Sequence, residues 1–115
     1  MNNKELQAAR KLLMLEASEA AEFIGNVSVR SWQYWETGQR TIPADVIDRM
    51  GDLLRMRGDM IREIESTATS GQLQLRYFGS LGEFQSAHAD GTVLGWRLHQ
   101  SAVAHFVGSG RAELA

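Results

Sequence analysis

The sequence predicts a mainly helical (α+β) protein, in which an N-terminal bundle of helices precedes a small C-terminal α/β region with two short strands. Three observations support this fold class. Apolar residues recur at three- and four-residue spacing through residues 1–66, which is typical of helices. A small, polar segment, residues 67–71, is interpreted as a linker. Apolar and polar residues then alternate, which indicates a strand.

The first two helices are marked by residues that favour helix ends. Asn2 and Glu5 are spaced as a capping pair, which predicts a helix over residues 3–14. Small and apolar residues predict a second helix over residues 17–24. This helix is expected to stop at Gly25 and Asn26, because both residues tolerate the left-handed backbone that a helix end needs.

Two further helices are predicted to follow. Ser28 is placed to cap a third helix that ends near Glu36. Pro43 is expected to open a fourth helix, because proline suits the first helical turn. We expect the fourth helix to continue to Ser66, although Gly58 could introduce a kink.

The C-terminal region, residues 72–115, is predicted to contain two strands and two helices. The strands are expected over residues 72–78 and 92–96. Ser80 is placed to cap a short helix between them. A last helix is predicted over residues 98–107, and the glycine-rich tail beyond it is expected to fray.

The two predicted strands indicate a second subunit. A lone two-stranded ribbon is marginal in water, and its edges leave backbone groups unpaired. A homodimer in which the strands and the last helix pack across a two-fold axis would cover these groups. The residues expected at this interface are apolar side chains of the strands and the last helix: Leu75, Tyr77, Val93, Trp96, Val103 and Phe106.

Composition narrows the class of protein. The chain has 115 residues and no cysteine, so disulfides and thiolate metal sites are excluded. No apolar run is long enough to cross a membrane, and the N-terminus lacks the apolar core of a signal peptide, so we expect a cytoplasmic protein. The net charge of −2 lacks the basic excess typical of nucleic-acid binders, so such a function would have to depend on a local site.

The sequence contains no residue pattern typical of an enzyme. The three histidines, His88, His99 and His105, do not have the spacing of a metal-binding pair on a helix. Neither a nucleophile elbow nor a phosphate-binding glycine loop is present. We therefore expect no catalytic residue, no metal and no cofactor.

Residues 20–38 predict a helix-turn-helix. Small residues on the second helix would let the third helix cross it closely, as this motif requires. We expect Val27, Trp32 and Trp35 to face the core, which leaves the opposite side of the third helix exposed.

The exposed side of the third helix carries groups that suit the major groove of DNA. Arginine can bond both acceptors of guanine, and glutamine can bond adenine in the same bidentate way. Hydroxyl groups and the free N–H groups at the helix start can hold phosphates. The residues expected to contact DNA are Ser28, Val29, Arg30, Ser31, Gln33, Tyr34, Thr37 and Arg40.

Two resemblances extend this interpretation. Residues 35–38, Trp-Glu-Thr-Gly, followed by Arg40 and Pro43, resemble the Cro/repressor (xenobiotic-response-element) type of helix-turn-helix. The whole chain resembles the anti-CRISPR-associated regulators of phages and mobile elements. The segments that carry this second resemblance are residues 4–8, 11–15, 18–22, 30–36 and 95–98.

The family resemblance implies a function and a structural brace. The function is that of a homodimer that binds inverted repeats in the promoter of an anti-CRISPR operon and represses the operon with its own gene. The brace is an ion pair between Arg10 and Glu36, which would orient the third helix. The chain departs from the Cro-type pattern in a longer turn and in lacking a glutamine at the start of the second helix, so more of the DNA contact falls to the third helix.

Two other functions remain open at this point. The N-terminal bundle of helices could serve as a protein-interaction module that does not bind DNA. The exposed side of the third helix, with its arginine and tyrosine, could also bind a structured RNA, such as the protein's own transcript. Nucleic-acid binding would weaken steeply with salt, because phosphate contacts release counterions, and this distinguishes it from a protein-interaction module.

Overall fold

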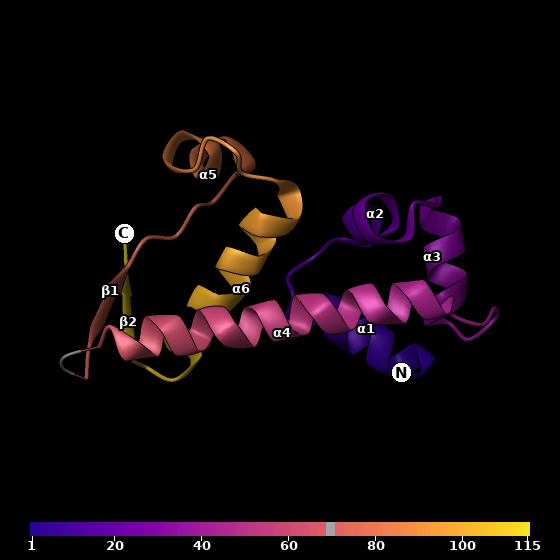
Figure 1. The fold of residues 1–115 in the computed structure, drawn as a ribbon, viewed down its shortest axis with the longest axis horizontal. Helices are drawn as coiled ribbons and strands as arrows, with labels where there is room; N and C mark the ends of the chain where they lie inside the picture. The colour runs from indigo at the N-terminus through magenta and orange to yellow at the C-terminus, as the bar shows by residue number, and fades with distance from the viewer. Residues whose placement is uncertain (69–70) are drawn as a thin grey trace. The chain divides into compact units, whose positions relative to one another are not determined.

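The computed structural model describes residues 1–68 and 71–115 and forms two compact units, Met1–Arg55 and Met56–Ala115 (Figure 1). Helices dominate both units, as the sequence predicts. The units divide inside a long helix, and residues 69 and 70 of the predicted linker lie outside the described residues. Among the described residues, no helix is long and apolar enough to cross a membrane.

The N-terminal unit contains short helices and the first half of a long one. Its elements are α1 (Asn3–Leu12), α2 (Ala17–Ala20), the π-helical turn η1 (Ala21–Gly25), α3 (Val29–Glu36) and the beginning of α4 (Ala44–Ser66). The Asn2 side chain accepts a hydrogen bond from the Glu5 N–H, and the Glu5 carboxylate accepts one from the Asn2 N–H, both at 2.8 Å. Helix α1 ends two residues before the predicted end, because Met14 adopts a left-handed backbone with φ of 60°.

The predicted second helix is divided between α2 and η1. Asn26, with φ of 52°, ends η1 in the left-handed conformation. A Cβ added at Gly25 would lie 3.0 Å from the Trp35 ring and 3.2 Å from the Trp32 ring. The glycine at this position therefore lets the indoles of α3 pack directly against η1.

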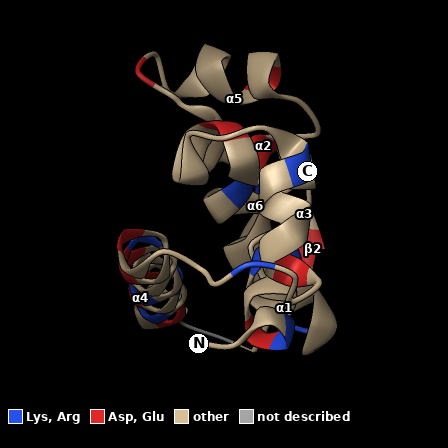
Figure 2. Cartoon of the chain, turned by 90° about the vertical axis from the view of Figure 1, so that its right-hand side faces the viewer, with Lys and Arg blue, Asp and Glu red and all other residues tan. Residues whose placement is uncertain are grey.

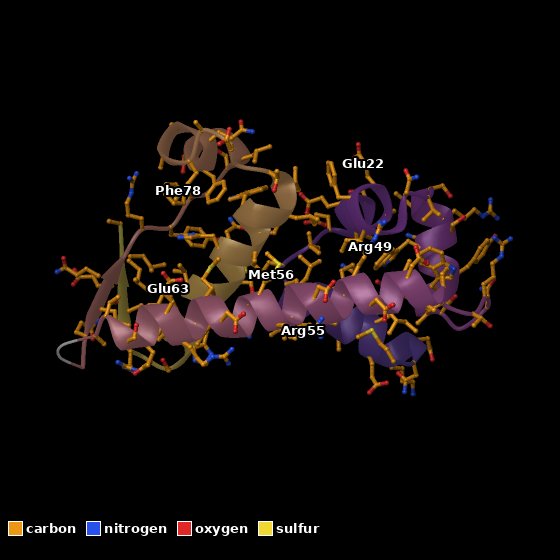
Figure 3. The ribbon with its side chains drawn as sticks, in the orientation of Figure 1. Glu22, Arg49, Arg55, Met56, Glu63 and Phe78 are labelled. Atoms are coloured by element: carbon orange, nitrogen blue, oxygen red, sulfur yellow. The ribbon has the colours of Figure 1, made fainter. Side chains whose placement is uncertain are left out.

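The core of the N-terminal unit joins all of its helices. Its fully buried side chains include Leu6, Leu13, Ile24, Trp32, Val46 and Met50. Trp32 and Trp35 meet edge to face, with ring centroids 5.5 Å apart. Arg49, labelled in Figure 3, donates a hydrogen bond of 2.7 Å to the Ile24 carbonyl and so ties α4 to the end of η1.

Helix α4 follows its predicted course. Its first turn begins at Pro43, whose carbonyl accepts hydrogen bonds from the N–H groups of Val46 and Ile47 at 3.1 and 3.2 Å. The helix continues through Gly58 to Ser66. Acidic and basic residues are mixed along it (Figure 2), and they form the ion pairs Asp52–Arg55 and Asp59–Arg62.

The C-terminal unit surrounds one buried helix. Its elements after α4 are β1 (Leu73–Leu75), α5 (Leu81–Ala87), α6 (Val93–Gly108) and β2 (Ala112–Leu114). The two strands are parallel, with Leu73 opposite Ala112 and Leu75 opposite Leu114. Ser80 caps α5 as predicted, because its hydroxyl accepts a hydrogen bond from the Glu83 N–H at 3.2 Å.

Three predictions for this unit are wrong or only partly met. Residues 92–96 do not form a strand, because the Thr92 hydroxyl accepts a hydrogen bond from the Gly95 N–H at 3.1 Å and caps α6. The tail does not fray, because residues 112–114 form β2 beside β1. The Leu73 N–H donates to the Arg111 carbonyl at 2.7 Å, and the Tyr77 N–H donates to the Ala115 carbonyl at 2.9 Å. The first strand also covers only part of the predicted residues 72–78.

Burial around α6 changes the expected dimer surface. Trp96, Val103 and Phe106 are already buried within the single chain, with 8%, 1% and 0% of their surface exposed. The Trp96 indole N–H donates a hydrogen bond of 2.8 Å to the Phe78 carbonyl. These three side chains therefore need no partner subunit, and the predicted interface residues that stay half-buried are Leu75, Tyr77 and Val93.

His99 lies in a ring cluster of the C-terminal unit. Its ring centroid is 5.2 Å from that of Phe78, 5.8 Å from that of Phe84 and 6.2 Å from that of His88. Its Nδ1 atom is buried without a hydrogen-bond partner among the described residues. Burial, and the charge of neighbouring His88, lower the pKa of His99 below its ordinary value of 6.5.

The lowered pKa of His99 predicts a stability that declines in mild acid. The unfolded chain binds a proton at His99 more readily than the folded chain does. The free energy of unfolding is therefore highest above the ordinary pKa of 6.5, and it declines as pH falls below that value. Urea unfolding at about pH 7.5 and 5.5 measures the change. His99→Phe should reduce the pH dependence, whereas His105→Phe, at an exposed position, should leave it intact. An equal pH dependence in all three proteins would contradict the prediction.

Candidate functional site

Helix α3 presents one exposed face. Its start is fixed by Ser28, whose hydroxyl accepts a hydrogen bond from the Ser31 N–H at 3.2 Å. Trp32 and Trp35 are buried on the other side of the helix. All eight side chains predicted to contact DNA reach the surface. Ser28, Val29, Arg30, Gln33, Thr37 and Arg40 are exposed, and Ser31 and Tyr34 are half-buried.

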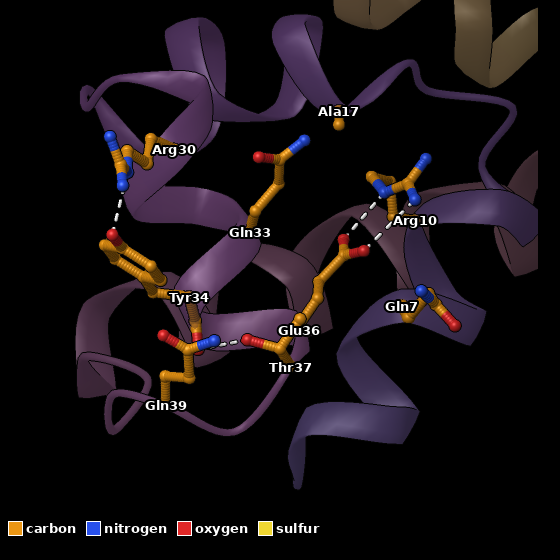
Figure 4. Close-up of a pocket in the computed structure, with 9 residues that line it drawn as sticks. All are labelled: Gln7, Arg10, Ala17, Arg30, Gln33, Tyr34, Glu36, Thr37 and Gln39. Atoms are coloured by element: carbon orange, nitrogen blue, oxygen red, sulfur yellow. Dashed lines mark hydrogen bonds and ion pairs between the residues drawn. The ribbon is translucent and has the colours of Figure 1, made fainter.

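Three of these side chains form a cluster around Tyr34. The Arg30 Nε donates a hydrogen bond of 2.7 Å to the Tyr34 hydroxyl oxygen (Figure 4). The guanidinium carbon of Arg40 lies 4.6 Å from the centroid of the Tyr34 ring, and that of Arg30 lies 5.7 Å from it. We call Arg30, Tyr34 and Arg40 the arginine–tyrosine cluster. It places two positive charges close together on the surface of a protein whose net charge is negative.

A hollow of about 440 Å³, lined mostly by side chains of polar residues, lies beside this face (Figure 4). Its lining comes from α1, α2, α3 and the loop after α3: Gln7, Arg10, Ala17, Arg30, Gln33, Tyr34, Glu36, Thr37 and Gln39. The amides of Gln7 and Gln39 were not predicted as site residues. Neither residue belongs to a recognisable sequence motif. They line the hollow only because α1 and the loop after α3 pack beside α3. Amide groups can both donate and accept hydrogen bonds, which suits base edges.

An ion pair fixes α3 against α1. Arg10 Nε and Nη2 donate to the two Glu36 carboxylate oxygens at 2.7 and 3.1 Å, and Arg10 Nη1 donates to the Leu15 carbonyl at 2.9 Å. The Trp32 indole N–H donates to the Glu36 carboxylate at 2.5 Å. The Arg10 and Glu36 side chains are only 13% and 6% exposed.

The environment of Glu36 favours its charged form. Burial alone would raise the pKa of Glu36, but hydrogen bonds from Arg10 and Trp32 and the charge of Arg10 outweigh burial and lower the pKa below its ordinary value. Glu36 therefore accepts hydrogen bonds as a carboxylate and is anchored to both α1 and the core. This arrangement orients the exposed face of α3.

Three of the other residues predicted to contact DNA lie at the two ends of α3, outside the arginine–tyrosine cluster. Ser28 and Ser31 lie together at the start of α3, with their hydroxyl oxygens 3.2 Å apart. The Thr37 hydroxyl donates to the Tyr34 carbonyl at 3.4 Å at the other end of the helix. Among the described residues, no group of three or more potential metal ligands is found.

Comparison with known proteins identifies relatives over nearly the whole chain. The model of the Aca2/YdiL-like family matches residues 1–114. The Aca2 repressor of Pectobacterium phage ZF40 is 49% identical over 115 residues, which cover 99% of each chain. An uncharacterized protein of Escherichia coli (strain K12), YdiL, is 30% identical over 107 residues, which cover 90% of this chain and 91% of the relative.

Proposed function

Since the chain belongs to the Aca2/YdiL-like family, we propose that it is a sequence-specific DNA-binding repressor of an anti-CRISPR operon that includes its own gene. The phage relative that is 49% identical is itself named a repressor. This family is consistent with the anti-CRISPR-associated regulators that the sequence resembles. The proposal that an anti-CRISPR operon is the target rests on that resemblance. DNA recognition is proposed to use a Cro/repressor-type helix-turn-helix formed by α2, η1 and α3.

The exposed face of α3 is the observation that carries this proposal. Arg30 and Gln33 lie on it with their polar ends exposed, and both side chains are suited to bidentate base contacts. The buried tryptophans and the Arg10–Glu36 pair hold the helix from behind. A rigid helix with a projecting polar face is the form in which such motifs enter the major groove.

We further propose that the repressor acts as a homodimer on an inverted repeat. One recognition helix reads only a few base pairs, and a two-fold dimer doubles the site with half-sites about 34 Å apart. The parallel pair of β1 and β2 has outer edges whose backbone groups could pair with a second copy. Leu75, Tyr77 and Val93 are the apolar side chains proposed to contribute, since they remain half-buried.

A mobility-shift assay with DNA from upstream of the protein's own gene tests the proposal. We expect a shifted complex that requires both halves of an inverted repeat, and sedimentation should give a dimer at micromolar concentration. The affinity should fall steeply with added salt, because phosphate contacts release counterions. Equal affinity for DNA with a scrambled repeat would contradict the proposal. Binding of a protein partner without salt dependence would instead favour an interaction module, and preferential binding of the transcript would favour RNA.

Arg30→Ala is expected to weaken operator binding by about 5- to 150-fold, equivalent to about 1–3 kcal/mol, because a bidentate guanine contact would be lost. The fold should remain intact, since the side chain is exposed. Arg55→Ala is the matched control, because Arg55 is an exposed arginine paired with Asp52 on α4. Titrations of the same operator compare the three proteins. Full affinity in Arg30→Ala would show that Arg30 does not read a base.

A further inference from the structure

We propose that Tyr34 is a positioning residue, which fixes the guanidinium groups of Arg30 and Arg40 before the nucleic acid binds. This inference rests on the proposed DNA-binding function and goes beyond it. It assigns to Tyr34 an action through the two arginines rather than a direct contact with a base or a phosphate. The geometry of the arginine–tyrosine cluster carries the argument.

The contact with Arg30 uses only one edge of its guanidinium group. Nε donates to the Tyr34 hydroxyl at 2.7 Å, while Nη1 and Nη2 have no hydrogen-bond partner within residues 1–68 and 71–115. A planar guanidinium held through Nε keeps its orientation and leaves both terminal nitrogens available for the two acceptors of a guanine. Tyr34 thus restricts Arg30 without competing for the groups that would read the base.

Arg40 is tied to the same tyrosine in two ways. Its backbone N–H donates a hydrogen bond of 3.1 Å to the Tyr34 carbonyl, and its guanidinium carbon lies 4.6 Å from the ring centroid. The chain can turn back toward Tyr34 because Gly38 adopts φ of 82°, a conformation that other residues avoid. The hydroxyl of Tyr34 therefore holds Arg30, and its ring lies 4.6 Å from Arg40 but 5.7 Å from Arg30, so the ring acts mainly on Arg40.

Prior ordering of a long side chain has a measurable effect on affinity. A flexible arginine must be immobilised when the complex forms. The conformational entropy that it loses reduces affinity by about three- to tenfold for each side chain. A tyrosine that holds both arginines in the free protein removes part of this cost. The hydroxyl and the ring should contribute partly separately, because the hydroxyl bonds Arg30 alone while the ring lies nearer to Arg40 than to Arg30.

Operator titrations in a double-mutant cycle separate this role from direct contact. Tyr34→Phe removes only the hydroxyl and should weaken binding by about three- to tenfold, with an unchanged salt slope. The same substitution in an Arg30→Ala background should have no further effect. Tyr34→Leu should cause an additional loss, and most of this loss should disappear in an Arg40→Ala background, because the ring lies nearer to Arg40 than to Arg30. If Tyr34→Phe weakens binding equally in both the wild-type and Arg30→Ala backgrounds, Tyr34 contacts the DNA itself and the proposal fails.

A second measurement decides the inference without DNA. Relaxation of the ¹⁵Nε–¹H signal of Arg30 should show an ordered side chain in the wild type and a mobile one in Tyr34→Phe. The exposed Arg62 signal provides the control, because its partner is Asp59 on α4. Equal order of Arg30 in the two proteins would overturn the positioning role. A wild-type chain that is ordered at Arg30 but binds no DNA would instead contradict only the proposed function.

Discussion

Glu36→Ala is expected to lower the free energy of unfolding by about 3–5 kcal/mol, because it leaves the guanidinium of Arg10 buried without its partner. The substitution also removes the acceptor of the Trp32 indole N–H. Thermal unfolding followed by circular dichroism should show a fall in melting temperature of more than about 10 °C. Operator affinity should fall as well, since the pair orients α3.

Two further variants define what Glu36 contributes. Glu22→Ala is the matched control, because Glu22 is exposed on η1 and projects away from the unit (Figure 3); its effect should stay within about 0.5 kcal/mol. Glu36→Gln keeps an acceptor for Trp32 but removes the charge that pairs with Arg10, so its stability should lie between those of the wild type and Glu36→Ala. A melting temperature of Glu36→Ala equal to that of Glu22→Ala would show that the ion pair does not stabilise the fold.

Phe106→Ala is expected to destabilise the C-terminal unit by about 3–5 kcal/mol, because the side chain is 0% exposed and its removal leaves a cavity. The loss should be the same at low and high protein concentration, since the single chain already buries the ring. Thermal unfolding at two concentrations measures this.

The neighbouring residue provides the control for Phe106. Val107 is 47% exposed, and Val107→Ala should change the free energy of unfolding by less than about 0.5 kcal/mol. A loss in Phe106→Ala that diminishes as the protein concentration rises would place Phe106 at a subunit interface, where dimer formation compensates for destabilisation. That result would contradict the burial of Phe106 within its own chain.

Helix ends were predictable where the signal is local. Asn2, Ser28 and Ser80 each cap a helix, and a capping side chain contacts a backbone group only three residues away. The sequence does not distinguish the same chemistry at Thr92, because the apolar run after this residue also fits a short strand. Strand β2 could not be predicted, since it pairs with β1 across nearly forty residues of sequence, and the alternation of Ala112, Glu113 and Leu114 is too short to indicate a strand.

The exposed face of the site was also predictable, and its surroundings were not. Helical periodicity alone places Arg30, Gln33 and Tyr34 opposite the buried tryptophans. The contact between Tyr34 and Arg40 depends on the path of the loop after Gly38, which a sequence pattern does not define. Gln7 reaches the same hollow only because α1 packs beside α3.

The hydrogen bond between Trp32 and Glu36 provides an intrinsic optical probe. An indole whose N–H is held by a carboxylate inside the core has an emission that depends on this contact. A shift of α3 relative to α1 would alter the contact and hence the fluorescence, without any attached dye. The other two tryptophans, Trp35 and Trp96, emit in the same band, so replacing both by phenylalanine isolates the signal of Trp32. Fluorescence spectra can therefore follow the orientation of the exposed helix in real time during a titration.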